Sequence, residues 1–240
     1  EAGVPERARL DLLKWQKKLK SNPLLEDNNL QHSLSFYFKT KFTNLAKDLE
    51  KFAQTVVEKI EPLVAENDFR FNLPRLEKYD GIGRSFDKIY YHPTYQMVGD
   101  LIYQTRLMSR LEKPGGMLES LSFFYLSSLA GEAGHNCPIA CSAGIIRVLS
   151  RYPDVYQQEK FLQKLTLDSY SKNYTGAQFV TEIQGGSDVG KNACIASKDA
   201  KGQWSITGEK WFCSNVDAEL ILLTARYDQN ISGTKGLGLF

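Results

Sequence analysis

Apolar side chains recur at helical spacing through the first two thirds of the chain. Between residues 44 and 66 they stand three or four positions apart, which places them on one face of a helix, and Pro62 predicts a kink or break. Pro93 suits the first turn of a later helix, and Asp154 is suited to cap another. The segments with this pattern are 5–20, 44–66, 93–111, 117–130, 138–149 and 154–165. Residues 117–130 are apolar on most sides and predict a deeply buried helix.

The pattern changes after Thr166 to short apolar runs separated by polar turns such as Asp199–Gly202. Runs of this kind predict antiparallel strands. The runs are 177–181, 193–197, 203–207, 210–214, 219–225 and 236–240. Residues 72–93 are irregular, with a turn at Tyr79–Arg84. The order predicts an α+β protein, with an all-α domain over residues 1–168 followed by the start of a β domain over 169–240.

The composition is that of a globular protein. The 240 residues are 42% hydrophobic and 24% charged, with a net charge of +2, which gives no global attraction to nucleic acid or membrane. Four irregularly spaced cysteines do not suggest a disulfide framework, so a reducing cytoplasm is expected. No apolar run approaches the ~18 residues that span a bilayer. The chain has no initiator Met and ends on strand-like residues, so we interpret it as a piece of a longer polypeptide, cut at both ends.

The first predicted helix is basic as well as amphipathic. Residues 5–20 carry Leu10, Leu12, Leu13, Trp15 and Leu19 among six lysines and arginines. A helix of this kind can lie on a membrane or on an acidic partner. We favour the simpler interpretation, a surface helix whose charged face is solvated.

Metal and nucleophile chemistry find little support. His135, Cys137 and Cys141 have the spacing of a partial metal site, but no second ligand cluster accompanies them and the helix is apolar. Buried structural cysteines are expected instead. His92, before Pro93, is expected to anchor a helix start. No serine or cysteine stands in a nucleophile motif.

Two stretches late in the chain carry the candidate chemistry. Gly185-Gly186-Ser187 resembles a phosphate-cradling loop, in which amides and a hydroxyl bind oxygens. It is neither a Walker loop nor a dinucleotide fingerprint, since no Gly-Lys-Ser/Thr follows and a strand is expected next. The carboxylate of Asp188 should point away from a phosphate. Within 208–215, Trp211 and Phe212 are neighbours on a predicted strand and are expected to face opposite sides, so that one faces the core and the other can pack on a ring system.

Together these stretches resemble the middle-domain signature of the acyl-CoA dehydrogenase family. The residues that carry the resemblance are Val180-Thr181-Glu182, Gly185-Gly186-Ser187-Asp188-Val189, Gly208-Glu209-Lys210-Trp211-Phe212, Ser214-Asn215, Ala218 and Ala225-Arg226. The N-terminal half is similar to the AidB-type branch, which is linked to the adaptive response to alkylation. Its matching residues are Tyr79-Asp80, Gly83-Arg84, Tyr91-His92-Pro93, Glu132-Ala133-Gly134 and Cys137-Pro138-Ile139.

The resemblance implies an N-terminal helical domain, a middle β-barrel begun in this chain and a C-terminal helical bundle absent from it. It implies non-covalent FAD and a homo-oligomer, dimeric or tetrameric. Thr181 would hydrogen-bond the isoalloxazine edge, Ser187 would hold the pyrophosphate beside Gly186, Phe212 would pack on the flavin and Ser214 would reach its reactive nitrogen. The implied cofactor-binding residues are Gln178, Phe179, Val180, Thr181, Gly185, Gly186, Ser187, Phe212, Cys213 and Ser214.

This sequence departs from the common family pattern at four positions. Phe212 stands where many members have Trp, and Ser214 where many have Thr, which keeps an aromatic face and a hydroxyl. Gln178 stands where many have tyrosine or another residue, and Ile183 where proline is common. The last two changes are expected to alter the substrate side of the loop.

The implied reaction is the α,β-dehydrogenation of an acyl thioester such as an acyl-CoA. The family's catalytic carboxylate belongs to the C-terminal bundle, so no residue of this chain is expected to be catalytic. Glu182 is expected to pair with a cation or to close a turn rather than to act as the base. An alternative is a flavin-containing damage-response protein that acts mainly by binding DNA through the C-terminal region. Acyl-chain length is not predicted, because the substrate pocket needs the absent helices.

Overall fold

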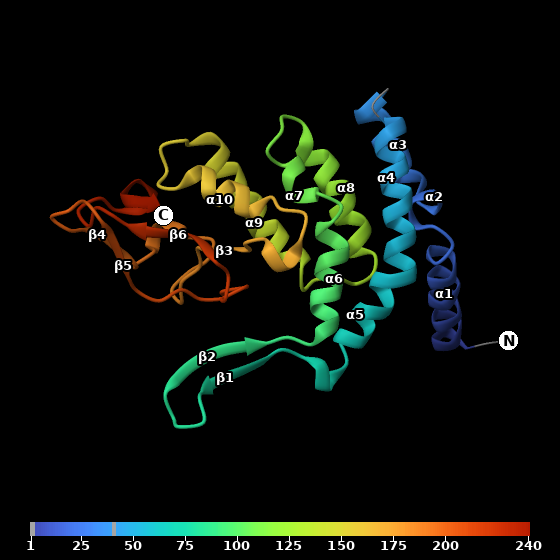
Figure 1. Cartoon of the computed structure of the whole chain (residues 1–240), viewed down its shortest axis with the longest axis horizontal. Helices are drawn as coiled ribbons and strands as arrows, with labels where there is room; N and C mark the ends of the chain where they lie inside the picture. Colours follow the sequence, from blue (N-terminus) through green and yellow to red (C-terminus); the bar gives the residue numbers. More distant parts are fainter. Residues whose placement is uncertain (1–2, 40–41) are drawn as a thin grey trace. The chain divides into compact units, whose positions relative to one another are not determined.

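The computed structural model describes residues 3–39 and 42–240, and it divides into two compact units. The helical unit contains residues 1–136 and 166–173, and the sheet unit contains residues 137–165 and 174–240. Figure 1 shows helices α1 to α8 in the first unit and the larger sheet in the second. The α+β order, with helices first and sheet later, is confirmed. The domain boundary between residues 168 and 169 stays a prediction, since the compact units are interleaved along the chain.

The helical unit is built mainly from eight α-helices and one π-helical turn among the described residues. They are α1 (Val4–Leu19), α2 (Pro23–Glu26), α3 (Asn28–Phe38), α4 (Phe42–Thr55), a π-helical turn η2 (Val56–Ile60), α5 (Glu61–Asn67), α6 (Pro93–Tyr103), α7 (Leu107–Arg110) and α8 (Gly116–Ser128). Leu49, Phe52, Val56 and Ile60 point inward and are buried with Phe123 of α8, as the apolar spacing requires. The helices predicted over 5–20, 44–66 and 117–130 are confirmed, whereas α2 and α3 were not predicted.

Two predicted features of these helices are wrong in detail. The segment 93–111 is not one helix, because Arg106 adopts a left-handed conformation with φ of 61°, which ends α6 and lets α7 begin. Helix α8 is not buried on most sides, since Met117, Leu118 and Leu121 are exposed. Its apolar outer face is therefore presented to solvent in the helical unit.

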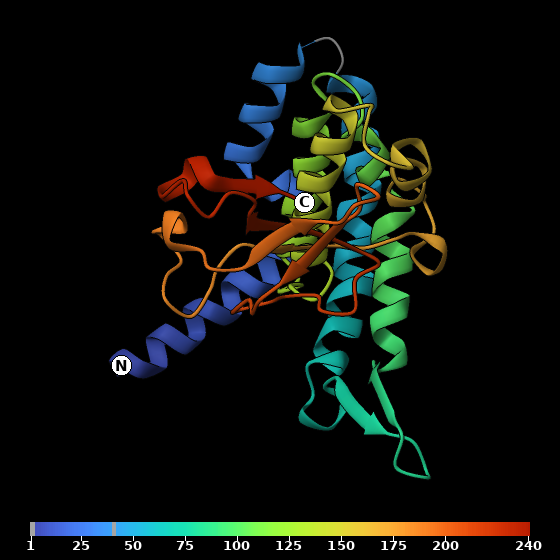
Figure 2. The same cartoon turned by 90° about the vertical axis from the view of Figure 1, so that its left-hand side faces the viewer.

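A two-stranded antiparallel ribbon replaces the irregular segment expected over residues 72–93. Strands β1 (Arg75–Tyr79) and β2 (Ser85–Tyr90) pair with each other alone, and nearly all their residues are exposed. The predicted turn is confirmed: Asp80 accepts hydrogen bonds from the amides of Ile82 and Arg84 at its centre. Figures 1 and 2 show the ribbon extending away from the helices of its unit.

A cluster of aromatic rings packs around Tyr95, in the first turn of α6. His135 stacks on Tyr95 with ring centroids 4.0 Å apart, Tyr91 stacks on the same ring at 4.5 Å, and Tyr170 meets His135 edge-on at 4.7 Å. The Nε2 atom of His135 lies 2.7 Å from the Tyr95 carbonyl oxygen, and burial lowers the pKa of His135 to about 4. The histidine is therefore a neutral core residue at pH 7. The segment Glu132–Asn136 joins this cluster through His135, and the Glu132 carboxylate accepts hydrogen bonds from the amides of His135 and Asn136.

The sheet unit contains most of helix α9 (Asn136–Arg151), helix α10 (Gln158–Leu165) and five strands. The strands are β3 (Gly176–Phe179), β4 (Ile195–Lys198), β5 (Trp204–Thr207), β6 (Leu220–Arg226) and β7 (Leu237–Leu239). The hydrogen-bonded order is β3-β6-β4-β5, with β7 also paired to β6. The purely antiparallel sheet expected from the sequence is wrong: β6 runs parallel to both β3 and β4, because long connections return the chain to it. No closed barrel is present over the described strands.

Two further predictions in this unit are corrected by backbone conformation. Residues 210–214 are not a strand, since Phe212 has a φ of 56°, which extended backbone does not adopt. Helix α10 begins at Gln158 instead of at Asp154, because Gln157 before it is left-handed, with a φ of 54°. Asp154 therefore does not cap the helix. The other five predicted runs are confirmed as strands within two residues at either end.

Gly99 gives a test of the aromatic cluster. A Cβ atom at Gly99 would lie 2.7 Å from ring atoms of His135 and Tyr170, which the packed rings cannot accommodate. Gly99→Ala should therefore lower the free energy of unfolding by about 1–3 kcal/mol, measured by urea denaturation. Gly81→Ala is the matched control, because nothing lies within 4 Å of the Cβ it would add. Equal stability of the two variants would show that the cluster is loosely packed.

Candidate functional site

A buried ion pair holds the two candidate loops of the sheet unit together. The Nζ atom of Lys210 lies 2.7 Å from Oε1 of Glu182, and the two side chains are only 8% and 3% exposed. Glu182 stands at the end of the segment that leaves β3, and Lys210 opens the segment that follows β5. The pair therefore fixes residues 180–187 against residues 208–215. The expectation that Glu182 pairs with a cation is confirmed.

Three backbone and side-chain donors complete the surroundings of the carboxylate. Oε2 accepts a hydrogen bond from the Ala193 amide at 2.6 Å and one from Nε2 of Gln184, and Oε1 accepts one from the Cys194 amide at 3.2 Å. Burial alone raises the pKa of Glu182, but the hydrogen bonds from Lys210 and the amides outweigh it and lower the pKa to about 2. Glu182 is therefore ionised and fully engaged at neutral pH. It cannot serve as a proton acceptor.

Asn192 and Thr224 extend this network to strand β6. Nδ2 of Asn192 donates to the Val180 carbonyl at 2.8 Å and to the Thr224 hydroxyl at 2.9 Å. Lys210 also lies within 3.4 Å of both of these acceptors. The loop is thereby tied to the centre of the sheet.

Arg226 ties residues 190–192, which follow the glycine turn, to residues 231–233. Its guanidinium donates to four backbone carbonyls, at distances from 2.7 to 3.3 Å. The acceptors are Gly190, Asn192, Ile231 and Gly233. The planar fork of an arginine suits this role, because its five donors point in fixed directions. The role of Arg226 in the family motif is thus structural in this chain.

The glycine turn presents its polar groups outward. Glu182 and Gly185 exchange backbone hydrogen bonds and close the turn, and the Thr181 side chain lies beside Gly186. Gly186 and Ser187 are exposed, and within residues 3–39 and 42–240 their amides and the Ser187 hydroxyl have no hydrogen-bond partner. Asp188 is turned toward Lys191, with 3.0 Å between Oδ2 and Nζ. The expected orientation of Asp188 agrees with this ion pair.

The segment after Lys210 presents an aromatic ring next to this turn. The Trp211 amide donates to the Thr181 carbonyl at 2.9 Å, so the two segments are adjacent at this point. Phe212 is 83% exposed in spite of its size, and its ring centroid lies 5.6 Å from that of Trp211. The expectation that one of these rings faces the core is wrong, since both are exposed and the segment is not a strand. Ser214 is also exposed, and no described residue bonds its hydroxyl.

The remaining predicted residues lie on or beside strand β3. Nε2 of Gln178 donates to the Cys141 carbonyl at 3.0 Å, and its side chain covers Gly144 of α9, so this residue ties β3 to the helix of its own unit. Phe179 and Val180 are half-buried, and Cys213 is half-buried between Phe212 and Ser214. Asn215, which the sequence did not single out as a binding residue, donates to Thr175 and Gly176 at 3.0 Å and anchors the end of the segment.

The structure thus brings the predicted loop residues into one region. Unpaired amides near Ser187, the hydroxyls of Thr181 and Ser214 and the exposed ring of Phe212 lie on two loops that share a buried ion pair. Amides and hydroxyls bind phosphate oxygens, and an exposed ring packs on a flat heterocycle. These residues fit a ligand with a diphosphate and an aromatic ring system.

The network residues Lys210, Asn192, Thr224 and Arg226 were not predicted as site residues. Lys210 stood in the quoted motif, and its charge among apolar neighbours was a usable signal. Asn192 and Thr224 carried no signal in the sequence, since their roles depend on strand pairing.

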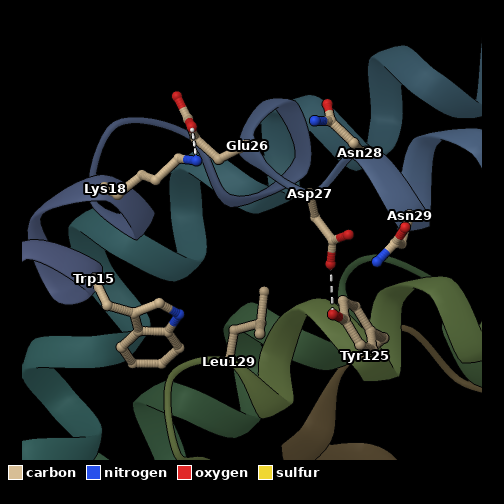
Figure 3. Close-up of a pocket in the computed structure, with 8 residues that line it drawn as sticks. All are labelled: Trp15, Lys18, Glu26, Asp27, Asn28, Asn29, Tyr125 and Leu129. Carbon is tan, nitrogen blue, oxygen red and sulfur yellow. Dashed lines mark hydrogen bonds and ion pairs between the residues drawn. The ribbon is translucent and has the colours of Figure 1, made fainter. Parts of the chain in front are cut away.

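The helical unit contains several cavities among its described residues. One of about 420 Å³ is shown in Figure 3, where Trp15 and Leu129 form the floor and Asp27 accepts a hydrogen bond of 2.6 Å from Tyr125. Lys18 is paired with Glu26 at 3.3 Å at the upper edge of the same view. The hydrogen bond to Asp27 raises the pKa of Tyr125 to about 12. The cavity offers opposite charges that already satisfy each other.

Metal-ligand clusters and membrane-spanning helices are not found in the parts of the chain that the structure describes. No group of three or more potential metal ligands occurs among them, and all four cysteines are free. Cys137 is exposed and Cys141 half-buried, so the expectation of buried cysteines is wrong for Cys137. None of the described helices has the length and apolarity needed to cross a membrane. Leu10, Leu12, Leu13 and Trp15 of α1 are all exposed.

Known proteins resemble this chain in both sequence and fold. The model of the adaptive response protein AidB N-terminal domain matches residues 16–172. Acyl-CoA dehydrogenase family member 11 of Caenorhabditis elegans is 28% identical over 238 residues, which cover 91% of this chain and 37% of that protein. Putative acyl-CoA dehydrogenase AidB of Escherichia coli (strain K12) is 27% identical over 165 residues, covering 63% of this chain and 30% of that protein.

Solved structures extend the comparison. Caenorhabditis elegans ACDH-11 in complex with C11-CoA superposes with a TM-score of 0.80 and 26% identity, covering 91% of this chain and 39% of that chain. Butyryl-CoA dehydrogenase from Megasphaera elsdenii gives 0.58 at 20% identity, covering 82% and 47%, which shows the fold alone. The chain spans less than half the length of each of these proteins.

The ion pair gives a sharp test of the site's architecture. Glu182→Gln leaves Lys210 buried without a counter-charge, so the free energy of unfolding at pH 7 should fall by about 3–5 kcal/mol. The exposed pair of Asp188 and Lys191 supplies the control, because Asp188→Asn should change the same quantity by less than about 1 kcal/mol. Urea denaturation measures both.

The same variant has a defined pH dependence. The pKa of Glu182 is about 2 in the folded protein and 4.5 ordinarily, so its stabilisation is present above pH 4.5 and is lost as pH falls toward 2. The stability difference between the parent protein and Glu182→Gln should narrow over that range. A difference that stays constant from pH 7 to pH 3 would contradict the assigned ionisation.

Proposed function

The chain belongs to the adaptive response protein AidB N-terminal domain family of the acyl-CoA dehydrogenases, and on that basis we propose that its sheet unit binds FAD in an oxidoreductase of acyl thioesters. The observation that carries the proposal is the pair of loops fixed by Glu182 and Lys210. They present unpaired amides, hydroxyls and the exposed ring of Phe212 to solvent. FAD, when bound, supplies the hydride acceptor for dehydrogenation.

Each exposed group has a part in holding the cofactor. The amides near Gly186 and the hydroxyl of Ser187 would hold the pyrophosphate, since amides and hydroxyls replace water around phosphate oxygens. Thr181 would hydrogen-bond the isoalloxazine edge, and Ser214 would approach its reactive nitrogen. The ring of Phe212 would pack on the flavin. An 83% exposed phenylalanine costs solvation unless something covers it, which supports a flat apolar partner at this position.

The proposed substrate is an acyl-CoA. The relative that superposes best among those named above is a complex with C11-CoA, and that ligand is brought to this chain as a proposal. The reaction would remove a proton from the α-carbon and a hydride from the β-carbon of the thioester. Glu182 is held ionised by Lys210 and cannot take that proton, so the residues of this chain bind and orient. A homo-oligomer and a cytoplasmic location stay predictions.

The reaction is tested on the protein that carries this chain, with a panel of acyl-CoA esters and an artificial electron acceptor. Turnover with an acyl-CoA supports the oxidoreductase. Absence of turnover, together with DNA binding that persists at physiological salt, would favour the damage-response alternative, because nonspecific DNA binding falls steeply as salt rises.

The pyrophosphate assignment predicts the effect of a charge at the turn. Ser187→Asp should weaken FAD binding by about tenfold or more, because it places a carboxylate beside the phosphates. The affinity is measured by flavin fluorescence after removal and re-addition of FAD. Ser197→Asp, on the exposed surface of β4, is the control and should bind FAD as the parent protein does. Unchanged FAD affinity in Ser187→Asp would contradict the assignment of the glycine turn to the pyrophosphate.

The exposed ring separates binding from folding. Phe212→Ala should lower FAD affinity by about tenfold while changing the free energy of unfolding of the cofactor-free protein by less than about 0.5 kcal/mol. Tyr156→Ala removes a ring that is equally exposed in the same unit and should affect neither quantity. Loss of stability in Phe212→Ala without loss of affinity would mean that the ring serves the fold.

A further inference from the structure

We propose that a second cavity, in the helical unit, binds a soluble phosphate monoester, independently of the flavin loops. The cavity has a volume of about 510 Å³ and is formed by α4, the π-helical turn, α6, α7 and α8. Four cations line it, namely Lys51, Lys59, Arg106 and Arg110, together with one carboxylate, Asp48. Its volume lies within the range of small-molecule sites, roughly 300–1,000 Å³.

The two lysines are not neutralised. Arg110 pairs with Glu119 at 2.6 Å and with Asp48 at 3.4 Å, and Arg106 pairs with Asp168 at 3.2 Å. Lys51 and Lys59 form no ion pair with any described residue. Two cations without an ion-pair partner among the described residues therefore line this cavity, and both also line a second hollow that includes Glu50 and Glu58. A phosphate monoester carries about −1.5 to −2 charges at pH 7, which matches the two lysines.

The backbone of the π-helical turn places these lysines in line. In a regular α-helix each step of four residues turns about 40° past a full turn, so Lys59 would point roughly 80° away from Lys51. The turn η2 (Val56–Ile60) winds more residues per turn and removes much of that drift. Lys51, Thr55 and Lys59 consequently line the same cavity, while Val56 and Ile60 are buried and do not line it. Such turns occur frequently at functional sites.

The opposite wall is also specialised. Arg106 adopts the left-handed conformation, which is strained for a residue with a Cβ atom. Its position ends α6 and brings Gln104, Thr105 and Arg106 to the cavity. The Nε atom of Arg110 is buried and has no hydrogen-bond partner among the described residues, so it retains a donor. Backbone strain of this kind persists where it serves a function.

The lining also accounts for an organic part of the ligand. Phe52 and Phe123 stand at the base of the cavity, and the guanidinium of Arg110 lies 4.8 Å from the centroid of the Phe123 ring. Leu101 adds a further apolar contact. The cavity in Figure 3 differs in this respect, since its lysine is already paired with Glu26 and no cation is free. The anionic ligand is therefore assigned to the cavity of Lys51 and Lys59.

The test measures the affinity of AMP and of adenosine for the intact protein by isothermal titration calorimetry. AMP should bind and adenosine should not, because they differ only in the phosphate. In the double variant Lys51→Gln/Lys59→Gln the affinity for AMP should fall by about tenfold or more per lysine. The double variant Lys17→Gln/Lys78→Gln changes the net charge equally at exposed positions outside the cavity and should bind AMP normally.

Three results would overturn the proposal. They are equal affinities for AMP and adenosine, an equal loss of AMP affinity in both double variants, and an AMP affinity that is unchanged in Lys51→Gln/Lys59→Gln. Vesicles that contain phosphatidic acid test the other source of a phosphate monoester, a lipid headgroup. Lysine-dependent binding to those vesicles without binding of AMP would overturn the soluble ligand. Ser187→Asp should leave AMP binding unchanged, which separates this site from the flavin loops.

Discussion

The sheet unit depends on one buried charge pair. Glu182 and Lys210 lie on two loops that are far apart in the sequence. Neither charge can stay buried without the other. Because the carboxylate also accepts the amides of Ala193 and Cys194, the pair gives the loops a fixed conformation instead of merely joining them. The rings and hydroxyls that face solvent are positioned by this arrangement, although none of them touches it.

The helical unit uses a different device for the same purpose. Its core residues on α4 follow regular spacing, and the irregularities lie at the surface cavity, in the π-helical turn and at Arg106. The π-helical turn acts on both sides of this helix: it keeps Phe52, Val56 and Ile60 buried and places Lys51, Thr55 and Lys59 along the cavity.

Sequence patterns predicted most helices and five of the six β runs because apolar spacing reports burial directly. They did not predict strand direction, since β6 becomes parallel to β3 and β4 through connections that have no local signature. Left-handed residues also escaped prediction: Arg106, Gln157 and Phe212 are not glycines, and their conformations follow from tertiary contacts. The ribbon of β1 and β2 was missed because its exposed strands lack an apolar face.

The loop residues of the candidate site were predictable as a motif, but their roles were not. Glu182 could be assigned a cation partner, because a carboxylate beside a glycine turn must be compensated when buried. The partner's identity required the fold. Gln178 illustrates the limit, since its side chain meets the Cys141 carbonyl of α9, a contact that no spacing in the sequence predicts.

Because of the ribbon formed by β1 and β2, different parts of this protein differ in their resistance to proteases. A two-stranded ribbon without a covering layer is only marginally stable, so it opens at a far lower free energy than the helices beneath it. It also carries Arg75, Lys78, Arg84 and Lys88 on exposed backbone. Trypsin therefore meets four cleavable bonds in the most easily opened segment, and the first nick divides α5 from α6 while both helices remain folded.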